Sequence, residues 1–108
     1  VAQLQLPIID NRIKLETSVF QDKAYVVIKN DHLPAPIYIH KEDKTYQASL
    51  MLCTHRQCEL NVTGSFLSCP CHGSEFSNKG KVLTGPADKD LQRFKLRVEG
   101  STIIIDLT

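Results

Sequence analysis

The chain has 108 residues, which is the size of one domain. Its 13 basic and 12 acidic side chains leave a formal net charge of +1, so nothing favours a nucleic acid or an anionic membrane surface as a partner. No run of about 18 apolar residues is present, so the sequence predicts no membrane span. Because the chain begins at Val1 and not at Met, an anchor or export signal ahead of it stays open.

Short β-strands separated by turn residues account for most of the chain. The predicted strands are residues 1–9, 12–20, 24–29, 37–39, 45–52, 59–62, 65–68, 81–83, 91–98 and 102–107. Pro7 interrupts the first segment, which indicates an edge strand or an arm. Residues 12–20 alternate apolar and polar side chains, as a half-buried strand does. Residues 24–29 are continuous β-formers, which is typical of a central strand.

The connections between these strands predict how they pair. The strands at 24–29, 37–39 and 45–52 form a predicted β-meander that runs directly into Cys53. Thr63-Gly64 is a turn signal between the next two strands. Residues 74–80 and 84–88 are predicted loops. No apolar pattern with a 3.6-residue period is present, so we expect an all-β fold.

All four cysteines and two of the four histidines lie in two short boxes, residues 53–58 (CTHRQC) and 69–74 (CPCHGS). Each box holds one Cys–His pair and one further cysteine. The pairs are Cys53 with His55 and Cys69 with His72, and the further cysteines are Cys58 and Cys71. Two thiolates and two neutral imidazoles can hold a metal centre, and the two remaining thiols can form a disulfide between the boxes.

The spacing within each box favours a tight loop whose backbone N–H groups point at a thiolate sulfur. Pro70 stiffens the second loop, and Gly73 allows the backbone to turn close to the ligands. A set of two cysteines and two histidines suits zinc or a histidine-ligated [2Fe–2S] cluster.

Two simpler interpretations compete with an iron–sulfur centre. Four cysteines alone allow three disulfide pairings, but two disulfides would leave both histidines without a role. A structural zinc site would normally pair Cys-x₂₋₄-Cys with His-x₃₋₅-His, and it would leave one cysteine in each box unexplained. The two remaining histidines, His32 and His40, lie in or beside polar turns and are predicted to be surface residues.

The motif C-T-H-x-x-C followed by C-P-C-H-G-S resembles the signature of Rieske iron–sulfur proteins, and residues 85–87 (GPA) resemble the proline loop that covers one side of the cluster in that family. The resemblance covers roughly residue 24 to the C-terminus. It implies an antiparallel β-sandwich or barrel, with residues 1–108 as a single domain. Cluster-binding loops at about residues 52–88 would form a small subdomain inserted in the β base.

The resemblance also implies a ligand set. Cys53 and Cys69 would hold one buried iron, and His55 and His72 would hold the other iron nearer the surface. Because neutral imidazoles replace two thiolates, Rieske centres span roughly −150 to +300 mV, against roughly −400 mV for plant-type ferredoxins.

A disulfide is the second implication of the resemblance. Cys58 and Cys71 would form the disulfide that separates the quinol-oxidising branch of the family from Rieske ferredoxins and ring-hydroxylating oxygenases. A disulfide favours an oxidising, extracytoplasmic compartment such as the periplasm.

Four residues near the implied ligands can be compared with the family pattern; one matches it and three depart from it. Ser74 stands where high-potential members donate a hydroxyl hydrogen bond to a bridging sulfide. Phe76 stands where the same members have a tyrosine that donates to a ligand sulfur, so we expect an intermediate potential. Arg56 and Gln57 replace the usual Leu-Gly; the first puts a charge at an apolar docking tip, and the second predicts a different turn.

The implied function is single-electron transfer at the iron held by the histidines. Oxidation favours proton loss from imidazole ligands, which is how such a centre accepts hydrogen from a quinol. One context is the soluble head or small subunit of a quinol–cytochrome oxidoreductase, with a cytochrome or a larger subunit as partner. A freestanding extracytoplasmic carrier, a small subunit of another oxidoreductase such as arsenite oxidase, and a zinc-binding module are the alternatives.

Overall fold

The computed structural model describes residues 3–107, and within that range the chain is almost entirely β-structure. The elements are β1 (Gln3–Gln5), β2 (Arg12–Glu16), the 3₁₀ helix η1 (Thr17–Phe20), β3 (Tyr25–Lys29), β4 (Ile37–Glu42), β5 (Thr45–Leu50), β6 (Asn61–Thr63), β7 (Phe66–Ser68), β8 (Glu75–Ser77), β9 (Val82–Thr84), β10 (Arg93–Glu99) and β11 (Thr102–Asp106). The prediction of an all-β fold is confirmed. No helix within residues 3–107 has the length and apolar character needed to cross a membrane.

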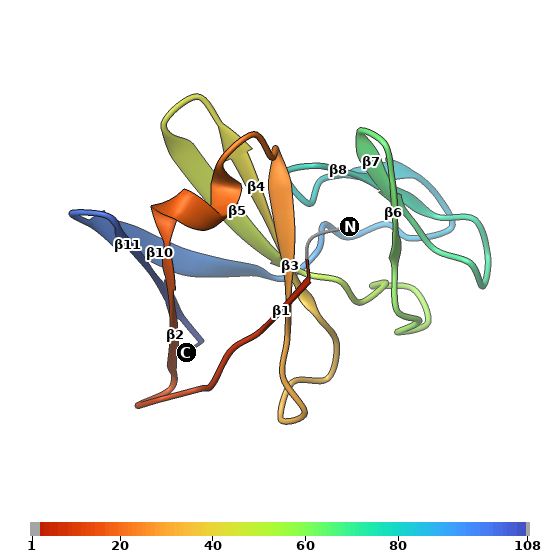
Figure 1. Cartoon of the computed structure of the whole chain (residues 1–108). Helices are drawn as coiled ribbons and strands as arrows, with labels where there is room; N and C mark the ends of the chain where they lie inside the picture. Colours follow the sequence, from red (N-terminus) through yellow and green to blue (C-terminus); the bar gives the residue numbers. More distant parts are fainter. Residues whose placement is uncertain (1–2, 108) are drawn as a thin grey trace.

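Seven strands form one curled sheet in the order β1-β3-β4-β5-β10-β11-β2. The sheet curls so that the first two strands of the chain, β1 and β2, stand at its two edges (Figure 1). The β3-β4-β5 meander is antiparallel, as predicted, and β3 lies inside the sheet. The pairing of β1 with β3 at this edge is parallel, whereas the other strand pairs of the sheet are antiparallel, as predicted. Val1 and Ala2 of the predicted first strand lie outside the described residues.

The core of this sheet follows from alternating side chains. In β2, Ile13 and Leu15 are buried while the residues between and beside them are exposed. They face Ile105 and Ile103 of β11 in the antiparallel register. Because each fully buried aliphatic side chain contributes about 1.5–3 kcal/mol, this layer stabilises the curled sheet as a base.

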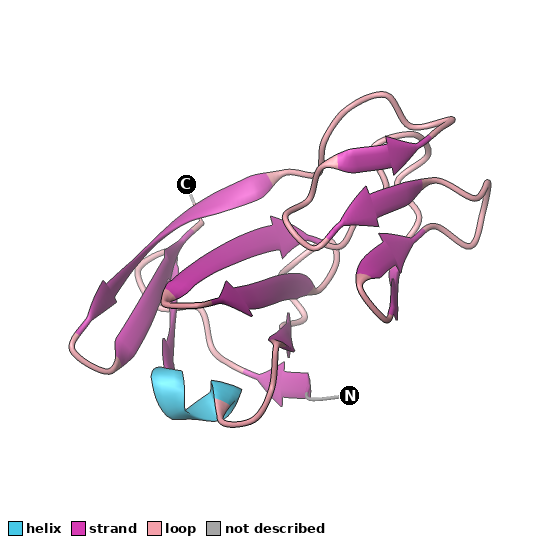
Figure 2. Cartoon of the chain, turned by 90° about the horizontal axis from the view of Figure 1, so that it is seen from above, coloured by secondary structure: helices cyan, strands magenta, loops and turns pink. Residues whose placement is uncertain are grey.

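Four short strands form a second sheet in the order β6-β7-β8-β9, at one end of the molecule (Figure 2). A second apolar core lies between the two sheets. Its residues are Val27, Tyr38, Met51, Cys53, Leu60, Leu67, Cys69, Phe76, Ala87 and Leu91. Two predicted ligands, Cys53 and Cys69, are therefore part of the contact between the sheets.

The turn after β8 fastens the small sheet to the base. The Tyr38 hydroxyl donates to Oδ1 of Asn78 at 3.3 Å, and burial, together with the charge of Tyr25, raises the pKa of Tyr38 to about 12. Gly80 has a φ of +81°, and a Cβ there would lie 2.8 Å from Oγ of the fully buried Ser49. Because a Cβ would collide with the Ser49 hydroxyl and the backbone is left-handed here, glycine is strongly favoured where the turn packs on β5.

Two predicted elements and the predicted exposure of one histidine differ clearly from the structure. The strand predicted over 12–20 ends at Glu16, and residues 17–20 form η1, which brings Phe20 into the core. The predicted loop over 74–80 contains β8, because residues 75–77 pair with β7. His40 is half-buried rather than a surface residue, since its ring stacks on Tyr38 at a centroid distance of 6.3 Å.

Candidate metal centre

The two cysteine–histidine boxes fold into loops with the same backbone hydrogen bonds. In the first loop, the Cys53 N–H donates to the Cys58 carbonyl at 2.8 Å, and the Gln57 N–H donates to the Cys53 carbonyl at 2.8 Å. In the second loop, the Cys69 N–H donates to the carbonyl of Ser74 at 2.8 Å, and the Gly73 N–H donates to the Cys69 carbonyl at 3.1 Å. The two loops are therefore equivalent in backbone structure.

Antiparallel pairing closes the base of each loop. Leu52 and Glu59 form an isolated bridge on either side of the first loop. Ser68 of β7 pairs with Glu75 of β8 on either side of the second. Both loops are thus tips of hairpin-like ladders, which places their cysteine and histidine side chains at fixed points.

The fifth residue of each loop is in the left-handed region, with φ +58° at Gln57 and +80° at Gly73. Glycine adopts this conformation readily, whereas a residue with a Cβ is strained there. Gln57 therefore takes the conformation that Gly73 has in the second loop, at a cost in backbone strain. The two loops of this chain thus share one turn, and a difference from the family's usual glycine-containing turn stays a prediction.

Cys53 and Cys69 are free thiols with exposed fractions of only 1% and 3%. The interpretation of four cysteines as two disulfides is therefore wrong. Burial acts to raise the pKa of the Cys69 thiol, but hydrogen bonds from the backbone N–H groups of His72 and Cys71 and from the Cys53 thiol outweigh it, so this pKa lies below its ordinary value. The N–H groups that were predicted to point at a thiolate sulfur are thus present in the second loop.

His55 and His72 are exposed, and each comes from a different loop. Their ring centroids are 5.2 Å apart, with the planes at 90°. The structure therefore brings the two predicted imidazoles together at the surface, while the two predicted thiols lie together in the apolar core.

Cys58 and Cys71 form the predicted disulfide, with an S–S distance of 1.99 Å and a Cα–Cα distance of 6.5 Å. Cys58 is half-buried and Cys71 is exposed. The bond joins the two loops covalently, and the Cys69 sulfur lies within 4.8 Å of both disulfide sulfurs.

A third loop, residues 85–89, is held against both boxes. Oγ of Ser74, a fully buried residue, accepts a hydrogen bond from the Ala87 N–H at 3.0 Å. The Thr54 hydroxyl donates to the Lys89 carbonyl at 2.7 Å. Since the Ser74 oxygen acts as an acceptor here, its hydroxyl hydrogen stays available to another acceptor. Sequence reasoning missed the role of Thr54, because no local pattern links residues 35 positions apart.

Two of the atypical residues lie on opposite sides of the site. Phe76 is fully buried in the apolar core that also contains Cys69, and it has no hydroxyl to donate. Arg56 is exposed, and within residues 3–107 it takes part in no ion pair. The charge at the tip of the first loop is therefore not neutralised by a neighbouring carboxylate.

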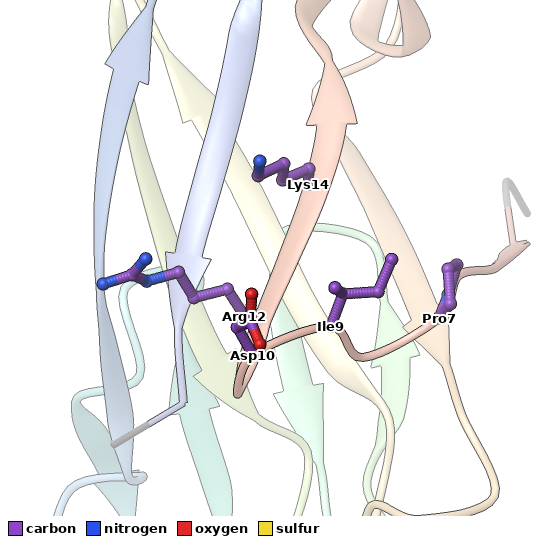
Figure 3. A pocket seen from close by; sticks show the side chains of 5 residues that line it. All are labelled: Pro7, Ile9, Asp10, Arg12 and Lys14. Atoms are coloured by element: carbon purple, nitrogen blue, oxygen red, sulfur yellow. The ribbon is translucent and has the colours of Figure 1, made fainter.

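The pocket in Figure 3 is formed by a different part of the fold, β2 and the link between β1 and β2. Its lining residues are Pro7, Ile9, Asp10, Arg12 and Lys14. None of the predicted metal ligands lines it, so it has no part in the candidate metal centre.

The chemistry of the donor set fits a histidine-ligated [2Fe–2S] cluster. Such a cluster needs two thiolates on one iron and two imidazoles on the other. The two free thiols and the two paired imidazoles supply these groups, and the thiols occupy the buried side. The same four side chains suit a Cys₂His₂ zinc site, but such a site needs neither the cross-linking disulfide nor the buried hydroxyl of Ser74.

Comparison with known proteins identifies the family of this domain. Residues 10–95 match the family model described as "Rieske [2Fe-2S] domain". The chain is 34% identical over 79 residues to the cytochrome b6-f complex iron–sulfur subunit of Synechococcus elongatus, which covers 71% of this chain and 38% of that protein. It is 36% identical over 75 residues to iron–sulfur subunit 1 of the same complex in Nostoc sp., covering 65% of this chain and 42% of that protein. The chain thus spans less than half the length of these relatives.

The fold has solved counterparts. The crystal structure of the plasma membrane Rieske protein of Synechocystis PCC 6803 superposes with a TM-score of 0.70 at 28% identity, covering 84% of this chain and 94% of that one. A chain of a hyperthermophilic respiratory complex III has a TM-score of 0.66 at 21% identity, covering 83% of this chain and 71% of that one, which supports the fold alone. On the family match, the paired loops and the disulfide, the chain belongs to the Rieske [2Fe–2S] domain family.

Proposed function

We propose that Cys53 and Cys69 bind one iron of a [2Fe–2S] cluster and that His55 and His72 bind the other. The observation that carries this assignment is the division of the four cysteines into two free, buried thiols and one disulfide. The imidazole pair at the surface supplies the two remaining ligands. On this assignment the whole chain acts as one domain, with the ligand loops within about residues 52–88.

When bound, a [2Fe–2S] cluster accepts and releases one electron. The protein around it would direct where that electron passes. Cys53 and Cys69 lie in an apolar core that excludes water, whereas His55 and His72 are exposed. Electron exchange with a partner would therefore take place at the histidine edge, where an imidazole N–H can also give up a proton.

Ser74 would tune the reduction potential. Its oxygen accepts from the Ala87 N–H, which fixes the side chain and leaves the hydroxyl hydrogen as a donor toward the cluster. A donated hydrogen bond favours the more negative, reduced state of a metal centre, so it raises the potential. The same bond holds the loop at 85–89 over the second box.

The protein would serve as the soluble head or small subunit of a quinol–cytochrome oxidoreductase, on the outer side of a membrane. Relatives named as cytochrome b6-f iron–sulfur subunits support a larger oxidoreductase complex, and the disulfide fits an oxidising compartment. Its partners would be a cytochrome or a larger subunit, with quinol as the reductant.

A freestanding extracytoplasmic electron carrier is a second candidate, and Arg56 favours it. A charged tip at the histidine edge suits a soluble protein partner better than an apolar quinol-site surface. Reduction of an acidic c-type cytochrome would slow as salt increases, and Arg56→Leu would remove part of that dependence. An unchanged salt dependence in Arg56→Leu would argue against this candidate.

Electron paramagnetic resonance of the dithionite-reduced protein, with iron and acid-labile sulfide analysis, tests the ligand assignment. We expect a histidine-ligated [2Fe–2S] signal and equal amounts of iron and sulfide. Cys53→Ser and His72→Ala should each abolish the signal, whereas His32→Ala, at an exposed histidine outside the boxes, should retain it. Zinc in place of iron would overturn the proposal, and a reduction potential that does not fall with rising pH would refute proton release from the histidines.

A further inference from the structure

Three of the four cysteine sulfurs form a compact group. The sulfurs of Cys58, Cys69 and Cys71 all lie within 4.8 Å of one another, and two of them are bonded as the disulfide. Cys53 is not part of this group. A free thiol so close to a disulfide is the arrangement from which thiol–disulfide exchange proceeds.

We propose that loss of the cluster allows the Cys69 sulfur to attack the Cys58–Cys71 disulfide, giving a Cys58–Cys69 disulfide and a free Cys71. This inference rests on the proposed function, because Cys69 is occupied as an iron ligand while the cluster is bound. Once the iron is lost, only local motion of the second loop separates the attacking sulfur from the bond.

The exchange needs no external oxidant or reductant. The Cys69–Cys58 bond forms as the Cys58–Cys71 bond breaks, and the proton released by the Cys69 thiol is taken up by the Cys71 sulfur. The number of disulfides and of free thiols is unchanged. The exposed position of Cys71 makes it the better leaving group, because water solvates the departing thiolate.

The alternative product, a Cys69–Cys71 disulfide, is less favourable. Those residues are separated only by Pro70, whose ring restricts the backbone between them. It would also disconnect the two loops, whereas a Cys58–Cys69 bond keeps them joined. Exchange would thus run between the loops.

The consequence is a chain that cannot readily take up a second cluster. The new disulfide removes one of the two thiol ligands, and Cys71 presents its thiol at the exposed side of the loop. Reloading would then require a thiol reductant to reverse the exchange. The bound cluster therefore protects the native disulfide pairing. In an oxidising compartment, which lacks such a reductant, a chain that has lost its cluster would stay unable to bind another.

Differential alkylation of the full chain tests this inference. Cluster-loaded protein is treated anaerobically with an iron chelator, and samples are quenched over time with iodoacetamide. The samples are then reduced and labelled with N-ethylmaleimide. Trypsin is expected to release residues 57–79 as one peptide that holds all three sulfurs, leaving Cys53 on a separate peptide. Fragmentation at the bond before Pro70 assigns each label to Cys69 or Cys71.

The iodoacetamide label on the long peptide should move from Cys69 to Cys71 with time, while the total stays at two labels per chain. Cys53 should carry the label throughout. Persistent labelling of Cys69 with none on Cys71 would overturn the inference. A fall in the total would mean net oxidation instead of exchange, and it would overturn the inference as well.

Two cysteine variants, and the iron and sulfide content before chelation, distinguish a failure of this inference from a failure of the ligand assignment. In Cys69→Ser, Cys71 should stay unlabelled in the first step. Cys53→Ser lacks a proposed iron ligand and cannot hold the cluster, so its Cys71 should become labelled without any chelator. Iron and sulfide content before chelation tests the proposed function independently. If Cys69 is alkylated while the cluster is intact, the ligand assignment fails, whatever the later disulfide map shows.

Discussion

The two ligand loops share a backbone and differ in the side chains that the backbone carries. Each begins with a buried cysteine whose N–H and carbonyl are both bonded within the loop. The left-handed position is occupied by Gly73 in the second loop and by Gln57 in the first. The second loop also contains Pro70 and Ser74, whereas the first contains Arg56. The ladders and hydrogen bonds therefore impose the loop shape, and residue choice decides how much strain and which functional groups each loop holds.

The two loops therefore supply different functional groups to the site. The second loop supplies the groups that act on the buried side, the N–H donors to the Cys69 sulfur and the Ser74 hydroxyl. The first loop supplies the exposed charge and the Thr54 bond to the third loop. The disulfide holds these unlike loops in one arrangement.

Removing the disulfide should have the largest effect on stability. For the double variant Cys58→Ala with Cys71→Ala, we expect the free energy of unfolding to fall by about 3 kcal/mol, because a loop of this length gains that much chain entropy when released. The native bond closes a sequence separation of 13. Denaturant unfolding of the cluster-loaded protein measures the loss. An unchanged midpoint with an unchanged slope would mean that the ladders alone hold the loops together.

Substitutions at the two equivalent left-handed positions should change the free energy of unfolding in opposite directions. Gln57→Gly should stabilise the protein, and Gly73→Ala should destabilise it, each by about 1 kcal/mol, because a Cβ is disfavoured there by roughly 1–2 kcal/mol. Apart from its chain neighbours, no atom would lie within 4 Å of a Cβ added at Gly73, so steric clash does not contribute. Thermal unfolding of both variants provides the measurement. Equal signs would show that the two loops are not equivalent in backbone energetics.

Much of the fold could be predicted from local pattern. The alternation in β2 predicted a strand correctly, because alternating burial requires alternating apolar and polar side chains. The continuous β-formers of β3 also predicted a strand correctly. The three-residue strand β8 was missed, because it lies between Gly73 and the turn at residues 78–80 and owes its conformation to pairing with β7. The parallel β1–β3 pair was missed for the same reason: pairing direction is a tertiary property.

For the candidate site, composition and spacing predicted the two Cys–His pairs as metal ligands, and the resemblance supplied their assignment to the two irons and the disulfide pairing. What could not be predicted is how three separate segments are held together. The Thr54–Lys89 and Ser74–Ala87 bonds join residues 35 and 13 positions apart, and neither polar pair stands out in the sequence. The burial of Cys53 and Cys69 between two sheets likewise depends on tertiary packing.

A hydroxyl introduced at Phe76 tests how hydrogen bonds near the second loop set the reduction potential of the cluster. Phe76→Tyr should raise the reduction potential by about 40 mV, which is one hydrogen bond of about 1 kcal/mol expressed for a one-electron couple. Phe76 is fully buried in the core that contains Cys69, so we expect the Cys69 sulfur, a proposed iron ligand, to accept a hydrogen bond from the new hydroxyl. Redox titration measures the shift. Phe66→Tyr, at a half-buried position in β7, is the control, and an equal shift there would remove the local explanation.

The smallest effect concerns pH, and it arises in the base sheet outside both loops. Burial lowers the pKa of His40 below 6.5, Glu42 acts to raise it, and Lys79 acts to lower it. The unfolded chain therefore binds a proton at His40 more readily than the folded chain, so stability should fall as pH drops below about 6.5. His40→Gln should lose less stability than the native protein between about pH 7.5 and about pH 5.5. Denaturant unfolding at both pH values measures this difference. If the two proteins respond equally, the pH dependence lies elsewhere and comparisons of the loop variants must be made at a single pH.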